Sequence, residues 1–132
     1  MHFVHLGIHT EFSITESIVR VSDLIKAAAN DEMPALAITD LSNLHAAVKF
    51  YKKCLDKGIK PIFGSTLRLN DAEHKVTLLA MSKKGWRSLT ELVSEGYISG
   101  QQLDIPCVQK EWILNQQEDL IVLLGQHSDV GK

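Results

Sequence analysis

Short runs of apolar residues recur along the chain and predict strands. Each run is rich in β-branched or aromatic residues and is bounded by polar or turn-forming residues. The polar stretch 70–73 predicts a turn between the third and fourth runs. The predicted strands cover Phe3–Ile8, Ala35–Thr39, Lys60–Leu69, Lys75–Met81 and Leu120–Leu124.

Two amphipathic segments between the first three strands predict helices. Ser22 and Asn43 are good N-caps, because their side chains can accept a hydrogen bond from a free amide of the first turn. Gly58 suits the end of the second helix. The first stripe consists of Leu24, Ile25, Ala28 and Ala29, and ends before Pro34. The second stripe consists of Leu44, Ala47, Val48, Tyr51 and Leu55.

The last third of the chain predicts two more helices. One covers Gly85–Ile98, and a shorter one covers Gln109–Asn115. The residues of the longer helix that are expected to face inward are Trp86, Leu89, Leu92 and Val93. Repeated alternation of strands and helices is typical of an α/β domain with a mainly parallel sheet. These local patterns do not distinguish an open sheet from a barrel.

Composition narrows the class of protein. The chain has 132 residues, of which 45% are hydrophobic and 23% charged, which suits one globular domain with a core. The net charge of −2 comes without a basic block, and this disfavours direct binding to duplex DNA. Cys54 and Cys107 lack metal-binding or redox spacing. We expect two buried thiols in a cytoplasmic protein, with a disulfide as the alternative.

Six short motifs occur in an order that resembles a known family. Their sequence and spacing are similar to the N-terminal PHP (polymerase and histidinol phosphatase) domains of bacterial replicative DNA polymerase III alpha subunits. The first three motifs are 3–13, 37–44 and 58–66. The others are 76–80, 85–89 with 92–94, and 119–125.

The resemblance implies a fold. PHP domains form a distorted β/α barrel, with the metal site at the carboxyl ends of the strands. A β/α barrel usually needs more than about 200 residues. We therefore expect residues 1–132 to be the N-terminal portion of a PHP domain, with polymerase domains absent from this chain.

The first ligand motif of the family is incomplete here. Metal-binding members carry a His-x-His pair, whose side chains share one strand face about 6.6 Å apart and reach one ion. These positions are Gly7 and His9. His5 shares the face of His9 but lies about 13 Å along an extended strand. We expect His5 to be a half-buried polar residue rather than a replacement ligand.

The other ligand positions are also altered. Asp40 and Leu41 occupy the Asp-His pair, Thr66 stands where a carboxylate is usual, and Lys75 replaces a histidine. Glu16 matches the family's acidic position. Asp40 could still ligate a metal, or it could cap the turn before the second helix. The ammonium group of Lys75 could repel a metal or fill the empty cation place opposite Asp40.

These substitutions predict a degenerate metal site with no catalytic residue and no metal or cofactor in this segment. The vestigial positions are Gly7, His9, Glu16, Asp40, Leu41, Thr66 and Lys75. The resemblance implies that Mg²⁺ serves a polymerase domain outside this chain.

The resemblance also implies a function. The parent protein is expected to be a DNA-directed DNA polymerase, a nucleotidyltransferase of chromosomal replication. This segment is expected to be a scaffold that contacts the remaining polymerase domains, the proofreading exonuclease subunit and the replicase holoenzyme, without contacting DNA or membrane. The alternatives are a metal-dependent phosphoesterase (a 3′–5′ exonuclease or a pyrophosphatase) and a generic α/β binding domain.

Overall fold

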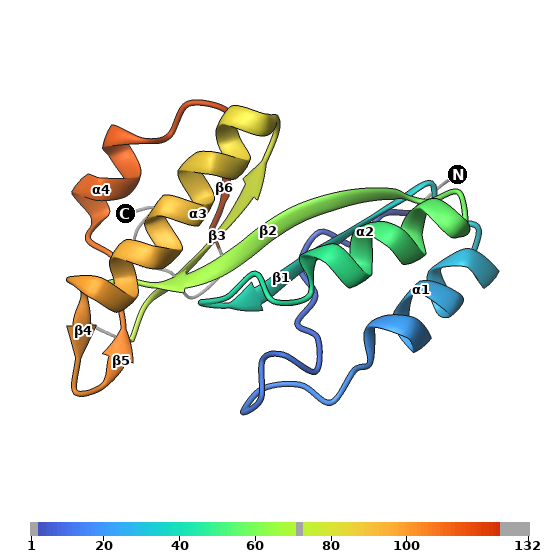
Figure 1. Cartoon of the computed structure of the whole chain (residues 1–132), viewed down its shortest axis with the longest axis horizontal. Coiled ribbons are helices and arrows are strands. Elements are labelled where there is room, and N and C mark those ends of the chain that lie inside the picture. Colours follow the sequence, from blue (N-terminus) through green and yellow to red (C-terminus); the bar gives the residue numbers. More distant parts are fainter. Residues whose placement is uncertain (1–2, 71–72, 125–132) are drawn as a thin grey trace.

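A four-stranded sheet organises the chain in the computed structural model, which describes residues 3–70 and 73–124. The strand order is β1-β2-β3-β6, and a separate two-stranded ribbon pairs β4 with β5 (Figure 1). The strands are β1 (Ala35–Leu41), β2 (Lys60–Arg68), β3 (Lys75–Ala80), β4 (Gln101–Gln102), β5 (Ile105–Pro106) and β6 (Leu120–Leu123). The helices are α1 (Val21–Asn30), α2 (Ala47–Asp56), α3 (Lys83–Ile98) and α4 (Lys110–Asn115).

The pairing of the strands differs from the expected mainly parallel sheet. β1 and β2 are parallel, whereas β3 is antiparallel to both β2 and β6. Only residues 69–74 connect β2 to β3, and a parallel crossover needs a dozen or more residues. The short connection therefore imposes an antiparallel pair. The predicted turn at 70–73 lies partly outside the described residues.

The first predicted strand lies beside β1 without forming a regular ladder. The Ala37 amide donates to the His5 carbonyl at 3.0 Å, and the Thr39 amide donates to the Ile8 carbonyl at 2.7 Å. Between these two hydrogen bonds the N-terminal segment advances by three residues, whereas β1 advances by two. This mismatch places an additional residue in the segment and interrupts the ladder, as in a β-bulge.

Both predicted N-caps of the first two helices are wrong. α1 begins at Val21, one residue before Ser22, so Arg20 occupies the N-cap position. α2 begins at Ala47, several residues after Asn43. The Asn43 side chain instead accepts from the His45 amide and donates to the Phe12 and Leu41 carbonyls.

The ends of the other elements follow the sequence more closely. Gly58, two residues after the end of α2, has φ of +69°, a conformation that favours glycine. α3 begins two residues earlier than predicted, and its Ser82 cap accepts from the Gly85 amide at 3.2 Å. No helix within 3–70 and 73–124 is long and apolar enough to cross a membrane.

Two hydrophobic clusters lie along the sheet, and β2 contributes to both. α1 and α2 cover the first cluster at one end of β2, and α3 and α4 cover the second at the other end (Figure 1). The inner face of α2 consists of Ala47, Phe50 and Cys54, so the predicted stripe is wrong except at Ala47 and the partly buried Leu44. Cys54 and Cys107 are both buried and are not joined in a disulfide, and burial raises the pKa of Cys54 to about 11.

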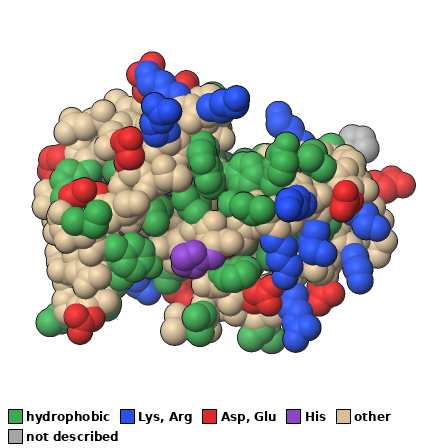
Figure 2. All heavy atoms as spheres, viewed as in Figure 1, with side chains coloured by type: hydrophobic (Ala, Val, Ile, Leu, Met, Phe, Trp, Pro, Cys, Tyr) green, Lys and Arg blue, Asp and Glu red, His purple; other side chains and the backbone are tan. Residues whose placement is uncertain are grey.

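An apolar groove separates α2 from α3. It encloses about 850 Å³, and hydrophobic side chains gather between the two helices in Figure 2. Phe63 lies in the groove with its ring centroid 6.3 Å from that of Tyr51 and 5.4 Å from that of Trp86. The outer residues of α2 that were predicted to face the core, Val48 and Tyr51, line this groove instead.

Gly64 is predicted to be indispensable to the central strand. It pairs with Thr39 and Leu79, and an added Cβ would lie 2.5 Å from the Leu78 carbonyl oxygen. Because that neighbour is backbone, Gly64→Ala should lower the free energy of unfolding by about 1–3 kcal/mol. Urea unfolding followed by circular dichroism measures this loss.

Gly7→Ala is the matched control, because nothing lies within 4 Å of a Cβ at Gly7. It should change the unfolding free energy by less than about 0.5 kcal/mol. Equal effects of the two substitutions would contradict the proposed close approach of β2 and β3.

Candidate functional site

The altered ligand positions converge on one edge of the sheet. Asp40 and Leu41 end β1, and Leu41 pairs with Thr66 near the end of β2. Lys75 begins β3, whose antiparallel direction brings its first residue to the same edge. The fold therefore gathers these residues where the resemblance places the metal site.

Asp40 is held by the N-terminal segment. Its carboxylate is 2% exposed and accepts three hydrogen bonds. These come from the Thr10 amide at 2.5 Å, the Thr10 hydroxyl at 2.7 Å and the Ser13 hydroxyl at 2.7 Å. The Ser13 oxygen in turn accepts from the Leu41 amide at 2.9 Å. We call Asp40, Thr10 and Ser13 the Asp40 clasp; in it, Asp40 fastens the upstream loop rather than capping the turn before α2.

Glu16 joins the remaining polar positions into a second group. Its carboxylate lies 3.0 Å from His9 Nδ1, 2.5 Å from Lys75 Nζ and 3.6 Å from Arg68 Nη2. The hydrogen bond from Lys75 is the largest cause that lowers the pKa of Glu16 below its ordinary value. The ammonium group of Lys75 pairs with Glu16, so the alternative in which it fills a cation place opposite Asp40 is not what the structure shows. These four residues form the Glu16 cluster.

Cross-strand register explains how the Glu16 cluster forms. Thr66 pairs with Thr77, and Arg68 pairs with Lys75, between β2 and β3. Residues two apart on a strand share a face, so these four side chains lie together. The Thr66 hydroxyl lies 2.9 Å from the Thr77 hydroxyl and 3.4 Å from His9 Nε2, and it donates to the Thr39 carbonyl.

Sequence reasoning missed four participants in this edge: Thr10, Ser13, Arg68 and Thr77. Two of them had a signal in the sequence, because Arg68 follows Thr66 by two residues and Thr77 follows Lys75 by two residues. Thr10 and Ser13 lie within the first quoted motif, but nothing local indicates that they bind a side chain about thirty residues away.

The other candidate positions do not supply a ligand. Gly7 is exposed and has open space beside it. Leu41 is partly buried and apolar. His5 is exposed rather than half-buried, and its ring packs edge-on against Phe3 at 4.7 Å between centroids.

The residues present do not fit a metal ion. Within 3–70 and 73–124, no group of three or more His, Cys, Asp or Glu side chains is arranged to hold one. The acidic candidates Asp40 and Glu16 both already accept hydrogen bonds from protein groups. A metal would have to displace these donors, whereas a structural or catalytic site needs three or four free ligands.

The lowered pKa of Glu16 predicts a pH-dependent contribution to stability. A carboxyl whose pKa is lower in the folded state stabilises the fold above its unfolded pKa, and this stability is lost as pH falls through the folded pKa. Glu16→Gln should therefore cost about 1 kcal/mol at neutral pH. The difference from the wild type should disappear as pH falls below the ordinary value of 4.5.

Chemical unfolding of both proteins across this pH range measures the difference. Glu118→Gln is the control, because Glu118 pairs with Lys84 at a site where both side chains are more than half exposed. An exposed pair contributes little, so its loss should be below about 0.5 kcal/mol at every pH. A Glu16→Gln deficit that persisted unchanged at acid pH would refute the ion-pair explanation.

Comparison with known proteins gives close relatives for nearly the whole chain. It is 42% identical over 126 residues to the DNA polymerase III subunit alpha of Pseudomonas fluorescens, which covers 92% of this chain and 11% of the relative. It is 38% identical over 136 residues to the subunit of Escherichia coli K12, which covers 98% of this chain and 12% of the relative. The chain thus spans about an eighth of these relatives or less.

Solved structures share the fold at low identity. One, assigned as a metal-dependent phosphoesterase from Bifidobacterium adolescentis, has a TM-score of 0.52 at 14% identity and covers 73% of this chain and 32% of that chain. An amidohydrolase from Chromobacterium violaceum has a TM-score of 0.50 at 15% identity and covers 70% and 34%. The expected fold class is confirmed by these neighbours and by the PHP domain model, which matches residues 5–131. The chain belongs to the PHP domain family.

Proposed function

We propose that this chain is the N-terminal PHP segment of the catalytic alpha subunit of a replicative DNA polymerase III. Its relatives with 38–42% identity over more than nine tenths of the chain support this proposal. In this role it serves DNA-templated chromosomal replication in the cytoplasm as a rigid scaffold. Nucleotidyl transfer and its Mg²⁺ belong to polymerase domains outside these residues.

One observation carries the scaffold role: the retained ligand-type side chains are already bound to protein groups. Asp40 is engaged by Thr10 and Ser13, and Glu16 is engaged by Lys75. Metal-assisted hydrolysis requires an ion with an open position for water. The side chains at this edge are therefore better suited to joining strands than to activating water.

A metal-dependent phosphoesterase is the second candidate function. The name of the Bifidobacterium neighbour favours it, although 14% identity supports a shared fold only. A 3′–5′ exonuclease or pyrophosphatase would need Asp40 to release Thr10 and Ser13. Gly7 and Leu41 would still supply no ligand atom.

The scaffold role requires surfaces for partners. The groove between α2 and α3 is apolar, and its Met81 and Tyr51 are 64% and 48% exposed. Exposed apolar surfaces of this kind mark interaction sites. We propose that the remaining polymerase domains pack here, that the proofreading exonuclease subunit docks elsewhere on the segment within the holoenzyme, and that the segment itself makes no DNA contact.

The scaffold role predicts that polymerase activity survives loss of the old ligand residues. In the full-length polymerase, Asp40→Ala and His9→Ala should leave primer extension per folded molecule within about twofold of the wild type. Asp40→Ala should still lower the unfolding free energy by about 2–4 kcal/mol, since three donors lose their acceptor. Primer extension, exonuclease-subunit binding and unfolding are measured on the same samples.

Asp23→Ala is the matched control, because Asp23 is exposed in the first turn of α1. It should leave all three quantities nearly unchanged. If folded Asp40→Ala or His9→Ala loses hydrolysis of single-stranded DNA or of p-nitrophenyl phosphate that the wild type performs with added Mn²⁺ or Zn²⁺, the phosphoesterase role is correct and the scaffold role is wrong.

A further inference from the structure

The layer of helices on one face of the sheet has a gap beside β2. α2 follows β1 and α3 follows β3, whereas the connection from β2 to β3, residues 69–74, contains no helix. Phe63 of β2 contacts Tyr51 of α2 and Trp86 of α3, so both helices pack on the same face of the sheet. The groove of about 850 Å³ is the part of this face that lies between the two helices (Figure 1). The order of the elements therefore leaves room for one more helix in this layer.

The groove exposes apolar side chains on its floor and on its walls. Phe63 and Leu79 belong to the floor, which β2 and β3 form, and Val48 and Trp86 belong to the helical walls. Val48 is 68% exposed, although it is a large apolar residue. A helix that lay in the gap would remove these side chains from water, which is favourable in proportion to the apolar area buried.

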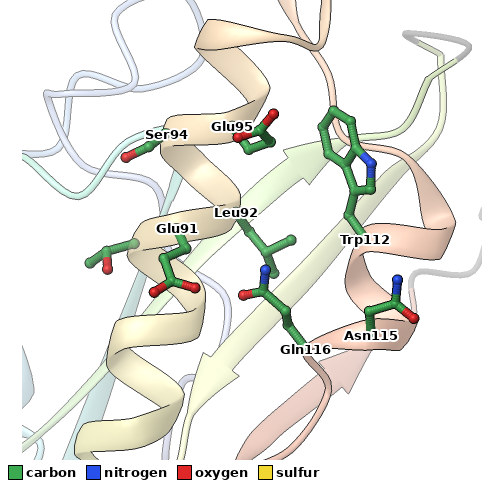
Figure 3. A pocket seen from close by; sticks show the side chains of 8 residues that line it. Glu91, Leu92, Ser94, Glu95, Trp112, Asn115 and Gln116 are labelled. Atoms are coloured by element: carbon green, nitrogen blue, oxygen red, sulfur yellow. The ribbon is translucent and has the colours of Figure 1, made fainter.

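The low polarity of the groove distinguishes it from the other large hollow of the molecule. That hollow lies between α3 and α4, encloses about 560 Å³, and carries carboxylates and amides on its walls, among them Glu91 and Gln116 (Figure 3). None of the described residues that line the groove is acidic, and most are apolar. Permanent interfaces are more hydrophobic than transient ones and resemble a domain core cut in half. The groove therefore suits a neighbour that stays in place.

The charged residues that line the groove are lysines. Lys60 begins β2 and Lys83 begins α3, and both are exposed. Among the described residues, no carboxylate oxygen lies within 4 Å of either ammonium group. Complementary charges fix the orientation of a neighbour and exclude wrong ones. The neighbour that fits this groove therefore carries acidic residues beside its apolar face.

We propose that an amphipathic helix with acidic flanks, from the remaining polymerase polypeptide, packs in this groove. This inference rests on the proposed function, in which polymerase domains continue beyond these residues. The chain spans 11% and 12% of two polymerase relatives, and 32% and 34% of two solved neighbours, so most of each lies outside the matched part. The helix would present apolar residues at positions i, i+3, i+4 and i+7 to β2 and β3. Its Asp or Glu residues would pair with Lys60 and Lys83.

Photo-cross-linking in the full-length polymerase tests the identity of the helix. The photoreactive residue p-benzoylphenylalanine replaces Tyr51, and mass spectrometry of the digested product identifies the captured peptide. We expect one region of the same polypeptide beyond residue 132, with apolar residues at helical spacing and Asp or Glu beside them. The control places the same photoreactive residue at Leu114, which is exposed on α4 outside the groove and should not capture that region.

Charge reversal tests the role of the lysines. Lys60→Glu with Lys83→Glu should raise the hydrogen-exchange rate of the captured helix about threefold to tenfold, because two attractions become repulsions and local opening becomes easier. Lys26→Glu with Lys110→Glu is the matched control. It makes the same change of charge at exposed positions of α1 and α4 outside the groove, and should leave the exchange rate unchanged.

Four results would overturn the inference. They are the absence of a cross-link from position 51, a cross-link to a second copy or to another subunit, capture of a region that lacks the helical apolar spacing or has basic flanks, and equal exchange rates in the two charge-reversed proteins. Primer extension by the same samples separates this inference from the proposed function. A polymerase that extends primers without the expected cross-link contradicts the inference alone, whereas the expected cross-link in a protein that extends no primer contradicts the proposed function alone.

Discussion

A buried carboxylate and the donors around it hold the N-terminal segment against the sheet. Asp40 lies in β1, and Thr10 and Ser13 reach it from about thirty residues upstream. A buried charge without hydrogen bonds would be strongly unfavourable, so the fold requires these donors at this place. Because the Thr10 amide is one of them, the clasp fixes the backbone of the segment as well as its side chains. These hydrogen bonds therefore position the N-terminal segment at this edge of the sheet.

The contacts around Asp40 and Glu16 also limit the chemistry available at this edge of the sheet. In a metal site, a cation balances the negative charges of the ligands. Here hydrogen-bond donors and cationic side chains of the protein do so. Hydroxyls and an amide surround Asp40, and Lys75 with Arg68 surrounds Glu16. These contacts cross-link β1, β2, β3 and the segment before α1. Such cross-links would give the segment the rigidity that the proposed scaffold role requires.

The sequence predicted the family and most of the helices and strands, because these depend on contiguous motifs and local periodicity. It did not predict which face of α2 is buried, since that helix has apolar residues on two faces, one in the core and one in the groove. β3 is antiparallel because its connection to β2 is too short for a parallel crossover. The repeated alternation of strands and helices had instead predicted a mainly parallel sheet. Partners such as Thr10 for Asp40 and Arg68 beside Lys75 depend on register and on long-range packing, which no local pattern encodes.

Hydrogen exchange at the Thr10 amide tests the central claim most directly. This amide donates to the Asp40 carboxylate at 2.5 Å, so its protection reports on the clasp itself. Protection in chelator-treated protein should equal that of neighbouring β1 amides, should not change with added Zn²⁺ or Mn²⁺, and should be lost in Asp40→Ala. Rapid exchange of the Thr10 amide in metal-free protein, slowed by either metal, would show that a cation rather than the clasp organises this edge.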